Sequence, residues 1–416
     1  MYGAPSKKLK SSLLIVSNSY YFRFSVYNDS LYSQIMSEVM SKIQMVDLKK
    51  QYQKIKPEID KAILDVVESS QFINGPEVKG FQQDLEKYLN VKHVIPCANG
   101  TDALQISMMA LGLQPGDEVI TPSYTYIATT EVIGLLRLKP VFVDCDPSTF
   151  NISPQAIANA ITPRTKAIVP VHLYGQACDM NAIMEIARAH NLFVIEDNAQ
   201  AIGCDYTLNN GSVVKTGAIG DVGCTSFFPS KNLGCYGDGG AICTNNDDLA
   251  IKIRMVANHG QSKRYYHDVV GCNSRLDSIQ AAILRIKLRE LDDYIERRNK
   301  AAAHYNKAFA EMGQITTPFK SGQSNHVYHQ YTIKLSDDVD RDALVEYLAT
   351  KEIPAMIYYP VPAHRQKMFS QLDTECADMT TTDWLTTRVL SLPMHTELTM
   401  EQLEYITESV IEFIKR

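Results

Sequence analysis

Residues 192–197 read Leu-Phe-Val-Ile-Glu-Asp, a short apolar run that ends in two acidic residues. Three similar runs rich in β-branched residues precede it: EVIT at 118–121, PVFVD at 140–144 and AIVPV at 167–171. Around and between these runs lie stretches with apolar residues at helical spacing, at 101–112, 129–138 and 179–190. This alternation of strand and helix predicts crossover connections and a largely parallel sheet with helices on both faces.

Helical patterns flank this region on both sides. Upstream, Pro57 and Pro76 each stand near the first turn of an expected helix. Downstream, a glycine-rich segment after Phe228 leads into a long helical stretch from about 275 to 312. The remaining expected elements are strands at 331–335 and 355–359, a helix at 341–350 and a C-terminal helix. We therefore expect an α/β fold with a large domain at 45–295 and a smaller C-terminal α+β domain at 296–416.

Residues 1–44 differ in composition from the rest of the chain. Basic residues come early, and the first acidic residue is Asp29. A targeting segment would explain this start, but its apolar run at 13–16 covers only four residues. We expect a disordered extension or a start codon assigned upstream of Met40.

Composition places the chain among soluble globular proteins. It has 416 residues, of which 45% are hydrophobic and 21% charged. The 41 basic and 47 acidic residues give a net charge of −6 with the signs interspersed, which disfavours nucleic acid or a membrane as partner. No apolar stretch approaches the roughly 20 residues that span a bilayer. The nine cysteines contain no Cys-x-x-Cys pair, so we expect a cytoplasmic protein with reduced thiols. The histidine spacing predicts no metal site.

Ligands of open parallel sheets bind beyond the carboxyl ends of the strands. Gly100 and Thr101 follow an expected strand at 94–96 and open a helix. Their N–H groups can form an anion cradle that suits a phosphate, although capping is the commoner use of a Gly-Thr-Asp segment. Asp197 ends another strand, where a carboxylate must be capped, hydrated or paired with a cation such as a protonated pyridine nitrogen.

Two further strand ends carry a lysine and an aromatic residue. Lys231 follows an apolar strand and precedes a glycine-rich loop, which keeps a lysine close to a cofactor and partly desolvated. Ser226, five residues upstream, can reach a phosphate. Tyr126 can stack on a planar ring, although packing is the commoner use of such a tyrosine. A phosphate cradle, an aromatic residue, a strand-end acid and a lysine in this order predict a pyridoxal phosphate site.

Five motifs carry a resemblance to a known family. They are CANGTDAL at 97–104, Glu196-Asp197 with Gln200, TSFFPSK at 225–231, GDGG at 237–240 and NSRLD at 273–277. With them, the chain from about Gln44 onward resembles the DegT/DnrJ/EryC1/StrS nucleotide-sugar aminotransferases. That resemblance implies a fold type I PLP-dependent transferase, with a mainly parallel sheet sandwiched by helices plus the smaller domain.

The resemblance also implies roles for individual residues. Lys231 would carry the covalently bound cofactor, Asp197 would pair with its pyridine nitrogen, and Gln200 would lie near the ring substituents. Asn273 would reach the cofactor phosphate of a neighbouring subunit, which implies a homodimer with shared active sites. The expected cofactor-binding residues are Gly100, Thr101, Tyr126, Asp197, Gln200, Ser226, Lys231 and Asn273.

The expected reaction is ping-pong transamination of a keto nucleotide sugar, with L-glutamate as amino donor and pyridoxamine phosphate as the intermediate cofactor form. Within the family, UDP-2-acetamido-2-deoxy-3-oxo-glucuronate is the first expectation for the sugar, aminated in O-antigen and lipopolysaccharide biosynthesis. A dTDP- or UDP-linked 3-keto or 4-keto 6-deoxyhexose is the alternative. The expected substrate-binding residues are Arg275, His329, Tyr358 and Tyr359.

Some of these positions leave alternatives open. Tyr358 stands where family members commonly carry histidine, and His329 follows many members but not the 3-oxo-glucuronate enzymes. Arg275 suits a uronate carboxylate and equally a salt bridge on a helix surface. His172 ends a strand, where either a contact to the site or a structural role fits it.

Three other functions are less consistent with the sequence. A nicotinamide-dependent dehydrogenase would need a G-x-G-x-x-G motif after a strand, which is missing. A dehydratase of the same family would carry histidine in place of Lys231. A non-catalytic binding protein with this fold has no need of a displaceable lysine, so the set of Asp197, Ser226, Lys231 and Asn273 favours an enzyme.

Overall fold

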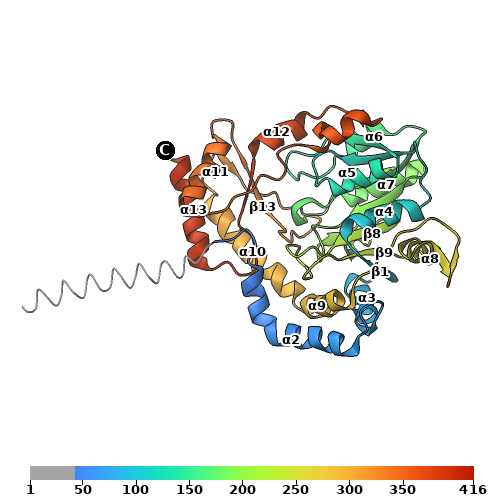
Figure 1. Ribbon diagram of the computed structural model, residues 1–416. Coiled ribbons are helices and arrows are strands. Elements are labelled where there is room, and N and C mark those ends of the chain that lie inside the picture. The colour runs from blue at the N-terminus through green and yellow to red at the C-terminus, as the bar shows by residue number, and fades with distance from the viewer. Residues whose placement is uncertain (1–42) are drawn as a thin grey trace, which may run out of the picture.

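A single large sheet forms the centre of the molecule (Figure 1). The computed structural model describes residues 43–416, so the expected extension at 1–44 lies outside the described residues except for its last two positions. The strand order is β1-β9-β8-β5-β4-β2-β3-β14. The strands are β1 (His93–Cys97), β2 (Glu118–Pro122), β3 (Lys139–Val143), β4 (Thr165–Ile168), β5 (Phe193–Asp197), β8 (Val222–Ser226), β9 (Gly240–Thr244) and β14 (Glu375–Cys376).

The pairing of these strands is mainly parallel. All neighbours from β8 through β5, β4 and β2 to β3 and β14 run parallel. Strand β9 runs antiparallel to both of its neighbours, β1 and β8. The structure thus confirms the α/β class and the mainly parallel sheet predicted from the apolar runs.

Helices cover both faces of this sheet, because each presents an apolar stripe to it. One face packs, in a single core cluster, against α3 (Pro76–Leu89), α6 (Pro154–Ala160), α7 (Met180–His190) and α9 (Ser278–Arg289). The opposite face packs against α4 (Gly100–Ala110), α5 (Ala128–Leu135) and α8 (Asp247–Ala257). In sheets of this kind, ligands bind beyond the carboxyl ends of the parallel strands.

A second, smaller sheet belongs to the C-terminal part of the chain. It is antiparallel and consists of β12 (Ile315–Thr316), β13 (Tyr331–Leu335) and β15 (Val389–Leu392). Its core cluster is separate and includes residues of α10 (Leu291–Ala308), α11 (Arg341–Thr350) and α13 (Met400–Ile414). Ile43 is buried in the same cluster. The remaining elements are α2 (Leu48–Ser69), α12 (Thr380–Arg388), three short 3₁₀ helices at Leu173–Gly175, Ala363–Arg365 and Lys367–Gln371, and the hairpins β6 (Asp205–Thr207) with β7 (Val213–Lys215) and β10 (Gln261–Lys263) with β11 (Tyr266–His267).

Two helix predictions need correction. Helix α3 begins at Pro76 as predicted, but Pro57 lies inside α2 and does not start it. The Asp47 carboxylate accepts the N–H of Lys50 at 2.9 Å and caps the helix earlier than the proline does. The helical stretch expected from 275 to 312 is two helices, because the N–H of Glu290 bonds the carbonyl of Lys287 and closes a tight turn.

The strand predicted at 355–359 is also wrong. In this segment only Met356 pairs with another strand residue, Ser391, in an isolated bridge. The carbonyl of Tyr358 instead accepts the hydroxyls of Tyr124, at 2.6 Å, and of Tyr174. The side chains of a residue after β2 and of a residue in the 3₁₀ helix at 173–175 therefore occupy the backbone carbonyl that a strand would use for pairing.

Part of the C-terminal segment joins the large sheet. Strand β14 pairs in parallel with β3, and the ring of Phe369 lies 5.1 Å from that of Phe142 on β3. The N–H of Ala363 donates to the carbonyl of Ser123 at 2.9 Å. Residues 363–376 thus pack on the large sheet, although the sequence analysis placed them in the smaller domain.

Two properties of the described residues agree with the composition. Within 43–416, no helix combines the length and the apolar character that crossing a bilayer requires. All nine cysteines are free thiols, and seven of them are buried.

Candidate active site

Most of the predicted site residues meet in one cavity of about 790 Å³, at the carboxyl ends of β5 and β8 and the start of α4. Those that line it are Gly100, Thr101, Tyr126, Asp197, Gln200, Ser226, Lys231, His329, Tyr358 and Tyr359. Asn273 and Arg275 do not line it. Thr125, Phe228 and Gln330 line it without having been assigned to the site.

One end of the cavity is the N-terminus of α4. The Asn99 side chain accepts the N–H of Asp102 at 2.7 Å and caps the helix, which leaves the N–H groups of Gly100 and Thr101 without intrahelical partners. A Cβ atom on Gly100 would lie 2.6 Å from the Cβ of Ser226, so only glycine lets the helix approach β8 this closely. The helix cap and the anion cradle are therefore both present. The N–H groups of Gly100 and Thr101, together with the Ser226 hydroxyl, suit a phosphate.

Asp197 lies at the end of β5, where its carboxylate is buried and held on both oxygens. Thr129 of α5 donates its hydroxyl to Oδ2 at 2.8 Å, and the N–H of Ala199 donates to Oδ1 at 3.1 Å. The backbone is fixed as well, because the Asp197 N–H bonds the carbonyl of Pro170 at 2.9 Å. The hydrogen bonds thus hold the carboxylate in one orientation beside the cavity.

Lys231 lies in the loop after β8, with its amine partly buried. Burial lowers the pKa of this amine to about 8, while the nearby Asp197 carboxylate partly offsets that effect. Within residues 43–416, the amine takes part in no hydrogen bond or ion pair at all. A lysine with this pKa has a sizeable neutral fraction near neutral pH, and the neutral amine is the nucleophile.

Tyr126 and Tyr359 form an aromatic wall. Their ring centroids are 6.2 Å apart with an interplanar angle of 44°. The Gln200 side chain donates to the Tyr359 hydroxyl at 3.1 Å and accepts the N–H of Tyr174 at 2.7 Å. Tyr126 is 57% exposed, so its ring face is available to a planar ligand rather than committed to core packing.

His329 and Tyr358 also line the cavity. His329 is buried, and its Nδ1 has no hydrogen-bond partner within the described part of the chain. Burial, assisted by the cations Lys231 and Arg298, holds the pKa of this imidazole well below its ordinary value. A neutral imidazole with a free nitrogen can accept or donate one hydrogen bond to a bound ligand.

Two residues that support the site were missed by the sequence analysis. Thr129 fixes the Asp197 carboxylate, and Arg298 of α10 donates to the carbonyls of Tyr328, His329 and Met394 at 3.0, 3.3 and 3.0 Å. Burial lowers the pKa of Arg298 to about 10. A threonine or an arginine within a helical pattern carries no sequence signal for such a role, because both residue types usually face solvent.

Asn273 and Arg275 lie apart from this cavity. Asn273 is exposed and pairs through its backbone with Asn258, and Arg275 is partly buried. Between them, Ser274 accepts the N–H of Ala98 at 3.1 Å, which ties this loop to the residues that precede α4. The segment is thus anchored next to the start of α4, but its two predicted binding residues do not line the cavity.

The cavity fits pyridoxal phosphate. The cradle at Gly100 suits its phosphate, the Asp197 carboxylate suits a protonated ring nitrogen, and the unpartnered Lys231 amine suits an aldehyde. Each of these groups is placed on a different element, and together they match the three functional groups of the cofactor.

Comparison with known proteins supports the same conclusion. Residues 53–411 match the model of the DegT/DnrJ/EryC1/StrS aminotransferase family. The chain is 47% identical over 375 residues to a pleiotropic regulatory protein of Geobacillus stearothermophilus, covering 90% of this chain and 99% of that protein. It is also 47% identical over 364 residues to the UDP-2-acetamido-2-deoxy-3-oxo-D-glucuronate aminotransferase of Pseudomonas aeruginosa, covering 88% and 98%.

A solved structure shares the fold and holds a cofactor. NtdA of Bacillus subtilis, with bound PMP, superposes with a TM-score of 0.82 at 33% identity and covers 90% of this chain and 86% of that one. The fold type I architecture and the pyridoxal phosphate cofactor predicted from the sequence are confirmed. On this sequence match and this geometry, the chain belongs to the DegT/DnrJ/EryC1/StrS aminotransferase family and is a pyridoxal phosphate-dependent enzyme.

Proposed function

We propose that this enzyme transfers an amino group from L-glutamate to the ketone of a nucleotide sugar, with UDP-2-acetamido-2-deoxy-3-oxo-D-glucuronate as substrate. The observation that carries the proposal is that the Lys231 amine and the Asp197 carboxylate share one cavity with the anion cradle of α4. The 47% identity to the Pseudomonas aeruginosa enzyme supports the choice of sugar.

Each residue has a proposed task toward the cofactor. When bound, pyridoxal phosphate would supply an aldehyde as acceptor of the amino group and a ring that serves as electron sink. Asp197 holds a proton on the ring nitrogen, because its ionised carboxylate stabilises the positive charge. The Lys231 amine binds the cofactor and then moves a proton at the reacting carbon, and its pKa of about 8 suits both uses. Tyr126 covers the face of the cofactor ring, and Gln200 holds the neighbouring Tyr359 by its hydrogen bond.

Binding of the cofactor phosphate is proposed for Gly100, Thr101 and Ser226. The first two supply helix N–H groups, and the Ser226 hydroxyl, which accepts the N–H of Phe228 at 3.3 Å, can donate its own proton. The phosphate would then be the fixed point of the cofactor, at the N-terminus of α4.

Recognition of the sugar is proposed for the wall formed by His329, Tyr358 and Tyr359. The free Nδ1 of His329 and the hydroxyl of Tyr359, which accepts from Gln200, can each bond a sugar hydroxyl. Arg275 is proposed for a carboxylate of the substrate. It lies outside the cavity of its own chain, so this role requires the site of a second subunit.

We also propose a homodimer with shared active sites. Asn273 is exposed and outside the cavity, which suits a residue that serves a neighbour's phosphate. Large apolar side chains are exposed nearby on the surface: Phe228 beside the cavity at 53% and, in and after the β10–β11 hairpin, Tyr266 at 61% and Val270 at 84%. Exposed apolar groups of this size are typical of interfaces.

The remaining proposals concern the cellular location, the pathway and the domain boundary. A cytoplasmic enzyme of lipopolysaccharide O-antigen biosynthesis would meet both nucleotide sugars and glutamate. The separate core clusters support a division near residue 295 into domains at 45–295 and 296–416, with residues 363–376 packed back on the larger one.

A panel of keto nucleotide sugars tests the substrate. The purified enzyme, loaded with pyridoxal phosphate and L-glutamate, is incubated with UDP-linked 3-oxo-glucuronate and with dTDP- and UDP-linked 3-keto and 4-keto 6-deoxyhexoses made in situ. An amino product from the glucuronate alone is expected. Turnover restricted to a 6-deoxyhexose would refute the glucuronate as substrate but not the aminotransferase function. No turnover with any sugar would refute the proposed function.

A further inference from the structure

Glu196, the residue before Asp197 on β5, holds a buried carboxylate with four hydrogen-bond donors. Its side chain points to the opposite face of the sheet from that of Asp197, because side chains alternate along a strand. Oε1 accepts the N–H groups of Ile219 and Gly220, each at 2.7 Å, and Oε2 accepts that of Gly217 at 2.8 Å. The fourth donor is the His172 imidazole, whose Nε2 lies 2.9 Å from Oε2.

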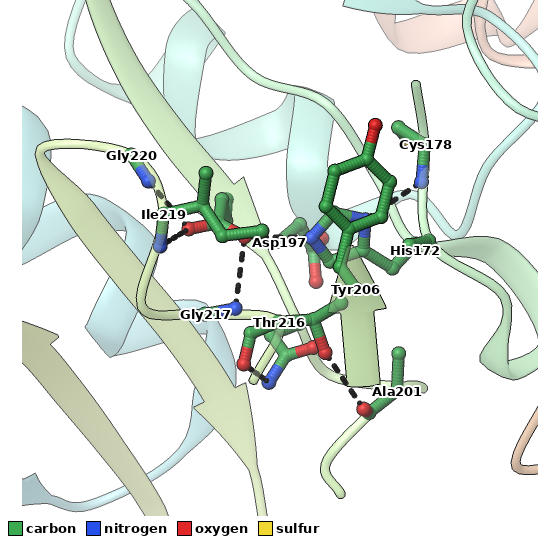
Figure 2. A network of polar contacts seen from close by, with 12 residues as sticks. His172, Cys178, Asp197, Ala201, Tyr206, Thr216, Gly217, Ile219 and Gly220 are labelled. Carbon is green, nitrogen blue, oxygen red and sulfur yellow. Dashed lines mark hydrogen bonds and ion pairs between the residues drawn. The ribbon is translucent and has the colours of Figure 1, made fainter. Parts of the chain in front are cut away.

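The loop at 216–220 is shaped to hold this carboxylate, and its donors Gly217, Ile219 and Gly220 are labelled in Figure 2. Gly217 has a φ of +81°, and a Cβ there would lie 2.8 Å from the side-chain nitrogen of Asn198. A Cβ on Gly220 would lie 2.7 Å from the carbonyl of Val194. The loop therefore uses glycines to aim its N–H groups at one anion, as backbone nests do.

His172 connects this anion to Asp197. Its backbone N–H donates to the carbonyl of Asp197 at 3.1 Å, while its side chain bonds Glu196. The N–H of Cys178 donates to Nδ1 at 3.1 Å, so Nδ1 accepts and the ring proton lies on Nε2, facing Glu196. Figure 2 shows Cys178, His172 and the loop glycines around the end of β5. One histidine thus bonds two consecutive residues of the strand, and His172 and Glu196 are both fully buried.

Neither residue lines the cavity, and no other part of the proposed mechanism uses them. We propose that Glu196 and His172 are positioning residues, which fix the end of β5 so that the Asp197 carboxylate stays within hydrogen-bond distance of the cofactor nitrogen. The inference rests on the role proposed for Asp197. Small displacements of such a group cost much of the rate, so a rigid anchor one residue away has a functional purpose.

Glu196→Gln tests the anchor. Its amide is isosteric, but the new NH₂ group would face N–H donors or the His172 imidazole, and at least one bond is lost. We expect the affinity of the apoenzyme for pyridoxal phosphate and kcat to fall by about tenfold each, while KM for both substrates changes by less than about twofold. Glu118→Gln is the matched control. Glu118 is equally buried and bonds Thr162 and Arg164, but it is the first residue of β2 and does not line the cavity. It should keep the affinity and kcat of the wild type even if its melting temperature falls.

A double-mutant cycle separates positioning from general damage. In the Asp197→Asn background, Glu196→Gln should reduce neither cofactor affinity nor kcat much further, because the residue it positions is already disabled. If Glu196→Gln lowered cofactor affinity and kcat by the same factors in both backgrounds, the inference would be overturned. A Glu196→Gln enzyme identical to the wild type would overturn it as well. An Asp197→Asn enzyme with full activity would instead refute the proposed function, whatever Glu196→Gln does.

His172 provides a second test if Glu196→Gln fails to fold. Glutamine at this position keeps a donor near the place of Nε2, whereas asparagine keeps only an acceptor near the place of Nδ1. We expect His172→Gln to retain more cofactor affinity and kcat than His172→Asn. Equal values for the two variants would contradict the anchoring role.

Discussion

The hydroxyl of Thr129 lies 2.8 Å from Oδ2 of Asp197, so a helix on one side of the sheet fixes the carboxylate at the end of β5. Both residues are buried, and the carboxylate has one further donor, the N–H of Ala199. Because a buried carboxylate attracts a cation more strongly than a well-solvated one does, we expect this oriented carboxylate to favour a protonated ring nitrogen.

Thr129→Val removes that hydroxyl at nearly constant volume. A hydrogen bond to a charged group is worth about 1.5–3 kcal/mol, so kcat should fall by roughly ten- to hundredfold. Steady-state kinetics checks this result. Thr130→Val is the control, because Thr130 is equally buried but donates to the carbonyl of Ile127 and does not contact Asp197. A Thr129→Val enzyme with the kcat of the control would contradict the role given to this bond.

Borohydride reduction should attach the cofactor to Lys231 alone. The reduced holoenzyme, digested and analysed by mass spectrometry, is expected to carry the adduct on that residue. Lys287 is an internal control, because burial also lowers its pKa to about 8, yet it lies outside the cavity and donates to the carbonyl of Gly234. Lys231→Ala should lose the adduct and at least about a hundredfold in kcat. An adduct on Lys287 would show that a low pKa, rather than the cavity, selects the lysine.

The apoenzyme should show the lowered pKa of Lys231 directly. Because burial favours the neutral amine, the folded pKa of about 8 lies below the usual value for lysine. The amine is then mostly protonated below that pH and mostly neutral above it. Labelling with an amine-reactive reagent, followed by mass spectrometry, should rise with a midpoint near pH 8. Asp197→Asn should move the midpoint lower, since the carboxylate raises this pKa, and an upward shift would contradict the charge assignment.

Gly100→Ala should weaken cofactor binding. The new methyl group would lie 2.6 Å from the Cβ of Ser226, and overpacking of this kind costs about 1–3 kcal/mol. We expect the dissociation constant for pyridoxal phosphate to rise about tenfold or more, measured by equilibrium dialysis. Gly313→Ala, where a Cβ meets nothing within 4 Å, should bind like the wild type. Unchanged binding by Gly100→Ala would show that the phosphate lies elsewhere.

The sequence predicted those parts of the fold that repeat a strong pattern. The strand at 331–335 and the helix at 341–350 have the predicted bounds, and the apolar runs at 118–121 and 192–196 lie within one residue of β2 and β5. Such elements are decided locally, by periodicity and burial. Pro57 and the segment 355–359 were misjudged because partners outside them decide their structure: the Asp47 cap for Pro57, and the hydroxyls of Tyr124 and Tyr174 for 355–359.

The same distinction applies to the site. Groups that stand at strand ends or helix starts, such as Asp197 and Gly100, were visible because position in the pattern marks them. Thr129 and Arg298 act through contacts between elements far apart along the chain, and nothing in their own segments marks them. Asn273 and Arg275 came only from family resemblance, and the cavity of a single chain does not contain them.

At strand β14 the chain returns from the smaller sheet to the large one. The chain leaves the large sheet through Glu290 between α9 and α10, returns to pair with β3, and only then enters α12 and β15. Domains joined by a single connection can rotate about it as a hinge, whereas three connections at separate points restrain such a rotation. While β14 stays paired with β3, we therefore expect the two sheets to keep a nearly constant separation during turnover, with small sliding movements in place of a hinged opening.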